Sequence, residues 1–281
     1  MTQYSLEAKT IKVESFQTAY LEGGDPAART VVLLHDGGFG TTGELCWGPV
    51  MEILAQKYHV VAPDLLGWGR TDKAVFLDRS PYAGRIEHLS AFVRVLGIEN
   101  AAIVGASFGG SLAVRAACLP SNPLGASAVI SFSGSGGPYR LRLDDLAEYT
   151  PSLAEATRLT EMLVTNTEGL EQHIQTRFEN SLIPGHWESL MAPRLKNPSA
   201  ERELPADPYE DQLRALTVPM LLVEGEHDSL LETGWASKLS SLNPIISQLV
   251  TEYAHEPNID NPVFTAQVID DYLSAGSDSN A

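Results

Sequence analysis

The stretch I-V-G-A-S-F-G-G-S, residues 103–111, decides the fold. Apolar residues precede Ser107, and a helix-length stretch, 108–118, follows it. The pattern G-x-S-x-G is typical of a serine on a tight turn between a strand and a helix, where glycines relieve crowding around a strained backbone. The same five letters also occur around ordinary loop serines, so the interpretation of Ser107 as a nucleophile depends on the segments around it.

Short apolar segments with the composition of buried strands recur along the chain, at 30–35, 59–64, 101–105, 126–132 and 218–225. They are rich in β-branched residues and bounded by Gly, Pro or Asp, which fits strands covered on both faces. Helix-length amphipathic stretches separate most of them, at 49–57, 82–96 and 108–118. Alternating strands and helices predict a parallel sheet with right-handed crossovers.

The ends of the chain extend this pattern. Residues 8–22 are predicted as two more strands, a hairpin at the sheet edge. After residue 225 a helix near 232–241, a strand near 245–250 and a final helix in V-F-T-A-Q-V-I-D-D-Y-L complete an eight-stranded α/β arrangement. The tail S-A-G-S-D-S-N-A is expected to fray.

The segment 138–206 breaks the alternation, because it holds no strand candidate and is punctuated by prolines. It is far longer than an ordinary connecting loop, which rarely exceeds about 15 residues. The sequence therefore predicts a core of residues 1–137 and 207–281, with an inserted helical cap at 138–206.

Charge and cysteine content restrict the partners. The formal net charge of −17 disfavours nucleic acid and acidic membrane surfaces. The chain has no signal-like start and no run near 18 apolar residues, so a soluble, cytoplasmic protein is expected. Cys46 and Cys118 form no Cys-x-x-Cys motif, which indicates neither a disulfide framework nor a thiolate metal site. No metal or cofactor is expected, and a homo-oligomer is left open.

A serine hydroxyl needs a base, and that base needs a group that fixes its tautomer. In this fold the order is expected to be Ser, acid, His. His255 lies after the last predicted strand and before the last helix, which makes it the best-placed base; the alternatives downstream of Ser107 are His173, His186 and His227.

The acid is expected just past the strand 218–225, where Asp228 stands. Glu224, inside the strand, and Glu226, in the turn, are rivals. Some proteins of this fold take the acid from the preceding strand, but the end of 126–132 carries no carboxylate. The predicted catalytic residues are therefore Ser107, Asp228 and His255.

Two backbone N–H groups are needed to stabilise an oxyanion. One donor is predicted to be the amide of Phe108, directly after the nucleophile. The other is expected from H-D-G-G-F-G, residues 35–40, with Gly37 first and Gly38 second. In the same segment His35 is interpreted as a structural residue, and Asp36 either tunes the oxyanion region or replaces a turn glycine.

Taken together, L-L-H-D-G-G, A-P-D-L-L-G-W-G-R-T-D, G-A-S-F-G-G, G-E-H-D and A-H-E-P stand in the order of the α/β-hydrolase superfamily, which the chain resembles over nearly its whole length. Within it, H-D-G-G-F-G, S-F-S-G-S-G-G-P and T-R-F-E-N are similar to the meta-cleavage-product hydrolases. Those enzymes hydrolyse a C–C bond in vinylogous 1,5-diketones from aromatic-ring degradation.

The resemblance implies substrate-binding residues in the cap. It implies that Arg177 binds a dienoate carboxylate, which suits the planar guanidinium. Trp187, in P-G-H-W-E, is a second substrate-binding candidate from the residues themselves, although packing of the cap is the favoured interpretation for it. The chain departs from the family pattern at Ala106, at Phe108 and at Asp36, and Glu256 follows His255 where some members have tryptophan.

Three functions remain open at this level. The first is C–C bond hydrolysis of a small hydrophobic, carboxylate-bearing substrate. The second is a carboxylesterase or lactonase that uses the same triad, and the third is a non-catalytic relative of the hydrolases. The C–C hydrolase and the esterase differ in one expected feature: the C–C hydrolase needs a cation on the cap side of the pocket to hold the substrate carboxylate.

Overall fold

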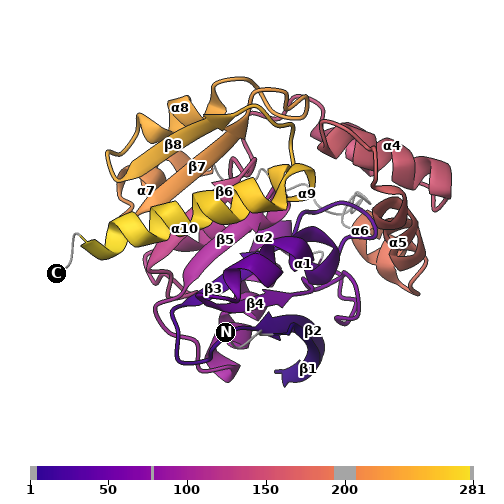
Figure 1. Ribbon diagram of the computed structural model, residues 1–281, viewed down its shortest axis with the longest axis horizontal. Helices are drawn as coiled ribbons and strands as arrows, with labels where there is room; N and C mark the ends of the chain where they lie inside the picture. Colours follow the sequence, from indigo (N-terminus) through magenta and orange to yellow (C-terminus); the bar gives the residue numbers. More distant parts are fainter. Residues whose placement is uncertain (1–4, 77–78, 193–206, 279–281) are drawn as a thin grey trace.

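The computed structural model describes residues 5–76, 79–192 and 207–278. Its centre is an eight-stranded sheet in the order β1-β2-β4-β3-β5-β6-β7-β8 (Figure 1). The strands are β1 (Glu7–Val13), β2 (Phe16–Gly23), β3 (Thr30–Leu34), β4 (His59–Pro63), β5 (Ala102–Ala106), β6 (Ala128–Phe132), β7 (Met220–Gly225) and β8 (Ile246–Thr251). β1 and β2 pair antiparallel at one edge, and β4, β3, β5, β6, β7 and β8 run parallel. The predicted α/β-hydrolase fold with a mostly parallel eight-stranded sheet is confirmed.

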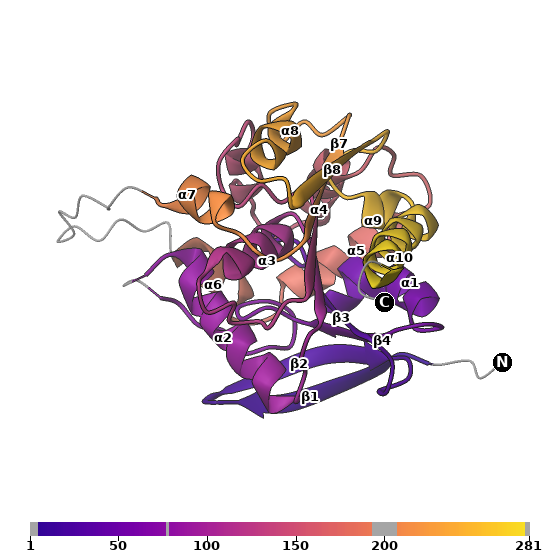
Figure 2. The ribbon, with the colours of Figure 1, turned by 90° about the vertical axis from the view of Figure 1, so that its left-hand side faces the viewer.

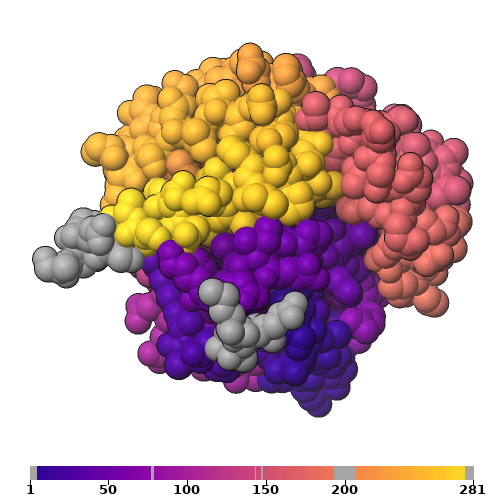
Figure 3. Space-filling view, in the orientation of Figure 1, coloured from indigo at the N-terminus to yellow at the C-terminus, as the bar shows by residue number. Residues whose placement is uncertain are grey.

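Helices cover both faces of the sheet (Figure 2). One face carries α1 (Gly43–Leu54), α9 (Pro257–Asp260) and α10 (Pro262–Asp278), and the other carries α2 (Pro81–Val95), α3 (Phe108–Cys118), α7 (Tyr209–Arg214) and α8 (Trp235–Ser240). In the space-filling view α10 lies across the first face beside α1 (Figure 3).

Alternating side chains of the central strands enter two separate apolar cores. Val32, Ile103 and Leu222 pack under α2, α3 and α8, whereas Val104 and Val223 pack under α1 and α10. Burial of one such side chain contributes about 1.5–3 kcal/mol to folding. The continuous apolar runs in the sequence are explained by this burial on both faces.

Two helices begin elsewhere than predicted. α1 begins at Gly43 and contains Pro49, because the Thr42 hydroxyl accepts a hydrogen bond from the Leu45 N–H at 3.0 Å and caps the helix. α8 begins at Trp235, because Gly234 takes a left-handed conformation with φ of 81° directly before it. Both differences arise from local capping of the helix start, which the hydrophobic periodicity of the sequence does not reveal.

The helices described between β6 and β7 are joined by turns and irregular segments. The segment contains η1 (Leu143–Ala147), α4 (Leu153–Leu163), α5 (Glu171–Ser181) and α6 (His186–Met191). α4, α5 and α6 lie together at one side of the molecule (Figure 1). Residues 193–206, which include the predicted end of the cap, lie outside the described residues, so the division at 138 and 206 stays a prediction. No described helix is both long and apolar enough to span a membrane.

Candidate active site

Ser107 lies at the sharp turn between β5 and α3, with φ of 50° and ψ of −112°. A non-glycine residue with positive φ is strained, and such strain is typical of functional turns. Two flanking glycines make the turn sterically feasible: a Cβ on Gly105 would lie 2.3 Å from the Gly109 carbonyl carbon, and one on Gly109 would lie 2.2 Å from the Leu34 carbonyl oxygen. The glycine positions of the motif therefore have a steric cause here.

The structure brings Ser107, His255 and Asp228 together from the carboxyl ends of β5, β8 and β7. Ser107 Oγ lies 2.7 Å from His255 Nε2, and His255 Nδ1 lies 2.8 Å from Asp228 Oδ2. Parallel strands deliver their carboxyl ends to one edge of the sheet, which explains how residues remote in sequence meet there. His255 is thus the histidine, among the four considered, that is hydrogen-bonded to the serine.

The charges around the hydrogen-bonded residues Ser107, His255 and Asp228 suit a histidine that acts as a base. Burial by itself lowers the pKa of His255, but the acidic groups around it, Asp228 first and then Glu256 and Asp36, together outweigh burial, so the net pKa is raised above its ordinary value of 6.5. The pKa of Asp228 is lowered: burial raises it, while His255 and the Leu230 N–H stabilise the carboxylate more strongly. An ionised Asp228 holds the imidazole with Nε2 toward the serine, which allows Nε2 to accept the hydroxyl proton.

The N–H groups predicted to bind an oxyanion differ in availability. Gly37 lies against Phe108, since a Cβ added to Gly37 would stand 2.8 Å from the Phe108 Cβ. The Gly38 N–H already donates to Asp36 Oδ1 at 2.6 Å. Within the described ranges, the N–H groups of Gly37 and Phe108 have no acceptor. The N–H groups of Gly37 and Phe108 are therefore free to donate to an oxyanion, whereas the N–H group of Gly38 is already engaged by Asp36.

His35 fixes the start of the same loop. Its Nδ1 donates to the Asp36 carbonyl at 2.6 Å, and its Nε2 accepts from the Leu65 N–H at 2.9 Å. These two bonds require one neutral tautomer, and burial lowers the pKa of His35. His35 is accordingly a structural side chain.

Arg177, predicted to bind a substrate carboxylate, is instead bonded to the loop. Its side chain is fully buried, Nη1 donates to the Phe39 carbonyl at 3.2 Å, and Nη2 lies 3.6 Å from Asp36 Oδ2. The pKa of Asp36 is lowered: burial raises it, and the Arg177 charge is the strongest of the opposing influences. The Arg177 side chain is therefore not exposed to solvent, and Arg177 does not line the active-site cavity.

Trp187 also lies away from the cavity lining. Its indole N–H donates to the Tyr149 carbonyl at 3.0 Å, and its ring packs with Phe39 and Tyr149. This position corresponds to the packing alternative for Trp187.

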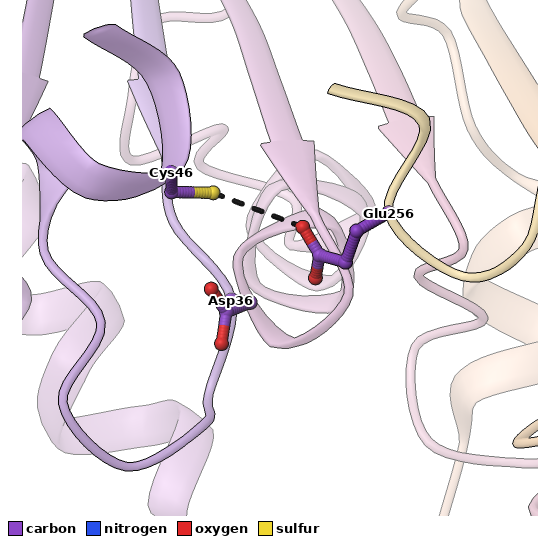
Figure 4. Close-up of side chains that lie close together, drawn as sticks. All are labelled: Asp36, Cys46 and Glu256. Atoms are coloured by element: carbon purple, nitrogen blue, oxygen red, sulfur yellow. Dashed lines mark hydrogen bonds between the residues drawn. The ribbon is translucent and has the colours of Figure 1, made fainter. Parts of the chain in front are cut away.

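Asp36, Cys46 and Glu256 form a buried cluster behind the loop (Figure 4). Their ligand atoms lie within 4.8 Å of one another, a spacing that a metal ion could use. Burial raises the pKa of the Cys46 thiol and that of Glu256, the latter to about 8, so both hold protons at neutral pH. A cation would displace two protons and share Asp36 with Arg177, so the cluster as arranged disfavours a metal.

A cavity of about 380 Å³ opens on Ser107. Its apolar wall includes Phe39, Trp68, Phe108, Leu163, Leu190 and Leu231, contributed by the core and by the helices between β6 and β7. Arg85 of α2 also lines it, although sequence reasoning assigned Arg85 no role. The sequence signal that could have identified Arg85 as a cavity residue was an arginine on the buried face of an amphipathic helix.

A serine, a histidine and an aspartate in this hydrogen-bonded order, at the edge of a parallel sheet, are the arrangement of the nucleophilic hydrolases. A model of the alpha/beta hydrolase family matches residues 31–268. The chain belongs to the alpha/beta hydrolase family and is a hydrolase.

Relatives of similar length carry related names. A 2-hydroxy-6-oxononadienedioate/2-hydroxy-6-oxononatrienedioate hydrolase of Cupriavidus pinatubonensis is 30% identical over 213 residues, covering 72% of this chain and 71% of that protein. A 2-hydroxy-6-oxo-6-(2'-aminophenyl)hexa-2,4-dienoic acid hydrolase of Metapseudomonas resinovorans is 26% identical, covering 98% and 96%.

Among solved structures, the 2-hydroxy-6-oxo-6-phenylhexa-2,4-dienoate hydrolase of Rhodococcus sp. strain RHA1 is similar with a TM-score of 0.78 at 22% identity, covering 96% of this chain and 99% of that one. A carboxylesterase of Bacillus subtilis also has a TM-score of 0.78, at 20% identity and with coverages of 96% and 92%. These two likenesses concern the fold.

Proposed function

We propose that this protein hydrolyses a C–C bond in a vinylogous 1,5-diketone of the 2-hydroxy-6-oxo-dienoate type. The observation that carries the proposal is the hydrogen-bonded series Ser107–His255–Asp228, whose serine lines a cavity with both apolar and polar walls. The names of the relatives supply the substrate class. The substrate is a small molecule, and the helices of the predicted cap, 138–206, cover it.

In the proposed mechanism His255 takes part in each proton transfer. The dienol is first ketonised in the site, which makes the bond next to the distal ketone cleavable. Ser107 Oγ then attacks that ketone and passes its proton to His255 Nε2, which Asp228 holds in place. The N–H groups of Gly37 and Phe108 stabilise the oxyanion. As the oxyanion re-forms a carbonyl, the C–C bond breaks and its electron pair passes into the conjugated chain; the resulting dienolate takes the proton from His255 and leaves as 2-hydroxypentadienoate. Water, deprotonated by His255, then hydrolyses the remaining acyl ester to a carboxylic acid.

Single substitutions in the triad test this function. Ser107→Ala and His255→Ala are each expected to lower kcat by at least about 10³-fold while the protein stays folded, because triad groups act as a unit. The assay follows bleaching of the yellow dienolate of 2-hydroxy-6-oxo-6-phenylhexa-2,4-dienoate, with circular dichroism as the folding control. Near-normal turnover in either folded variant would contradict the assignment.

One observation favours a carboxylesterase or lactonase as the second candidate. Arg177 forms an ion pair with Asp36 at 3.6 Å and lies outside the cavity lining, so the charge of the cation that the resemblance implied for a carboxylate is already compensated. p-Nitrophenyl acetate measured beside the dienolate separates the two candidates. Turnover of the ester alone would favour the esterase.

A further inference from the structure

Four charged side chains stand among the described residues that line the active-site cavity: Asp36, Arg85, Arg140 and Asp144. Asp36 is balanced by Arg177 at 3.6 Å. Arg140 and Asp144 are exposed and lie 3.9 Å from each other. Arg85 is the charge in this lining that remains to be compensated.

Arg85 is held in a fixed position by aromatic rings. It lies in the first half of α2, and only 7% of its surface is exposed. The guanidinium carbon stands 4.7 Å from the centre of the Trp68 ring and 5.5 Å from that of Phe108, and both rings also line the cavity. Stacking of this kind orients a planar guanidinium without neutralising it.

The hydrogen-bonding capacity of Arg85 is mostly unused. Nη1 donates to the Pro81 carbonyl at 3.0 Å, whereas Nε is buried without an acceptor. In the part of the chain that the structure describes, no carboxylate lies within 4.0 Å of this guanidinium. Burial lowers the pKa of Arg85 to about 10, so the group still carries its charge at neutral pH.

A buried cation without a counter-charge is unfavourable in the empty site, and a ligand anion relieves that cost. Charge-assisted hydrogen bonds from arginine to a carboxylate are among the strongest that a protein offers to a small molecule. Phe108 stacks under Arg85 and directly follows Ser107, so the cation and the nucleophile face one cavity.

We propose that Arg85 binds the carboxylate end of the substrate in this cavity, and that Arg177 holds the Asp36 loop instead. The assignment rests on the proposed function, because the dienoate supplies the carboxylate. A substrate anchored at Arg85 reaches with its distal ketone toward Ser107, and the apolar wall encloses the carbon chain between them.

Isothermal titration calorimetry with two small probes tests the assignment without turnover. Hexa-2,4-dienoate carries the carboxylate, and hexa-2,4-dienamide is its neutral isostere. The variants are Arg85→Met, which keeps apolar volume against Trp68 and Phe108, Arg85→Lys, which keeps the charge, and Arg140→Met, a matched control for the exposed arginine of the same lining.

Arg85→Met is expected to raise the Kd of the dienoate by about 10- to 100-fold, the effect of losing one hydrogen bond to a charged group. The amide Kd is expected to stay within about threefold, and Arg85→Lys to fall between wild type and Arg85→Met. Arg140→Met is expected to change the dienoate Kd by less than about threefold, since exposed charges contribute little.

The assignment is overturned by any of three results. These are equal weakening of dienoate and amide in Arg85→Met, unchanged dienoate binding in that variant, and a wild-type protein that binds the carboxylate no more tightly than the amide. Failure of the proposed function gives a different result. In that case the wild-type protein binds hexa-2,4-dienoate through Arg85 but does not bleach the yellow dienolate.

Discussion

Substitution of Asp36 by asparagine tests the interpretation of the Asp36–Arg177 pair most directly. Both side chains are buried, and Asp36 also accepts hydrogen bonds from Gly38 N–H and Thr41 Oγ1, each at 2.6 Å. Asparagine has the same shape, but one of its two acceptor oxygens becomes an NH₂ group. That group would face donors from Thr41 or Gly38, and Arg177 would remain buried as an uncompensated cation.

The expected loss of stability follows from two estimates. Unit charges 3.6 Å apart attract by roughly 4–5 kcal/mol at an effective dielectric constant of about 20. Removal of one partner from a buried ion pair typically costs about 3–5 kcal/mol. Asp36→Asn is therefore expected to lower the unfolding free energy by about 3–5 kcal/mol and the Tm by on the order of 10 °C.

Urea unfolding at pH 7, followed by circular dichroism, measures this loss. The matched control is Asp144→Asn, an exposed carboxylate near Arg140, which is expected to change stability by less than about 0.5 kcal/mol. The double variant Asp36→Asn/Arg177→Met removes both charges and is expected to be about 2 kcal/mol more stable than the sum of the single losses implies. A loss below about 1 kcal/mol in Asp36→Asn, or strict additivity in the cycle, would refute the buried-pair interpretation.

Two further predictions concern pH. Because the pKa of His255 is raised above 6.5 and the base acts when neutral, kcat/KM is expected to fall below a midpoint above pH 6.5. In Asp228→Asn that midpoint is expected to move to lower pH and kcat to drop by about 10⁴-fold, which a pH series of initial rates measures; an unmoved midpoint would contradict the assignment of Asp228. The pKa of Glu256 is raised to about 8 by burial and by Asp36, whereas the unfolded chain releases this proton near its ordinary value of 4.5. The wild type is therefore expected to lose stability between about pH 5 and 8 relative to Glu256→Gln, as urea unfolding at both ends of the window measures; equal pH dependence in the two proteins would count against it.

The strands and the nucleophile turn were predictable because their signals are local. The five strands β3 to β7 are buried on both faces, so their apolar character is continuous in the sequence. The steric demand at Ser107 requires glycine at Gly105 and Gly109, and that demand leaves a readable motif. The order of serine, acid and histidine follows from the topology of the sheet, which the strand pattern already implies.

The starts of α1 and α8 were less accessible to sequence reasoning. The Thr42 hydroxyl begins α1 well before the predicted start, and a left-handed Gly234 delays α8. Both depend on one backbone conformation or one hydrogen bond. A periodic pattern carries no information about either.

The sequence by itself determined the α/β architecture, the turn at Ser107 and the candidates Asp228 and His255, because each depends on neighbouring residues or on strand order. The tertiary structure decided which charges are compensated. Arg177 and Asp36 come from different parts of the chain and neutralise each other, whereas Arg85 faces the cavity with aromatic rings and no carboxylate in its described surroundings. Pairing of buried charges depends on side-chain contacts across elements, and the tertiary fold alone brings those elements together.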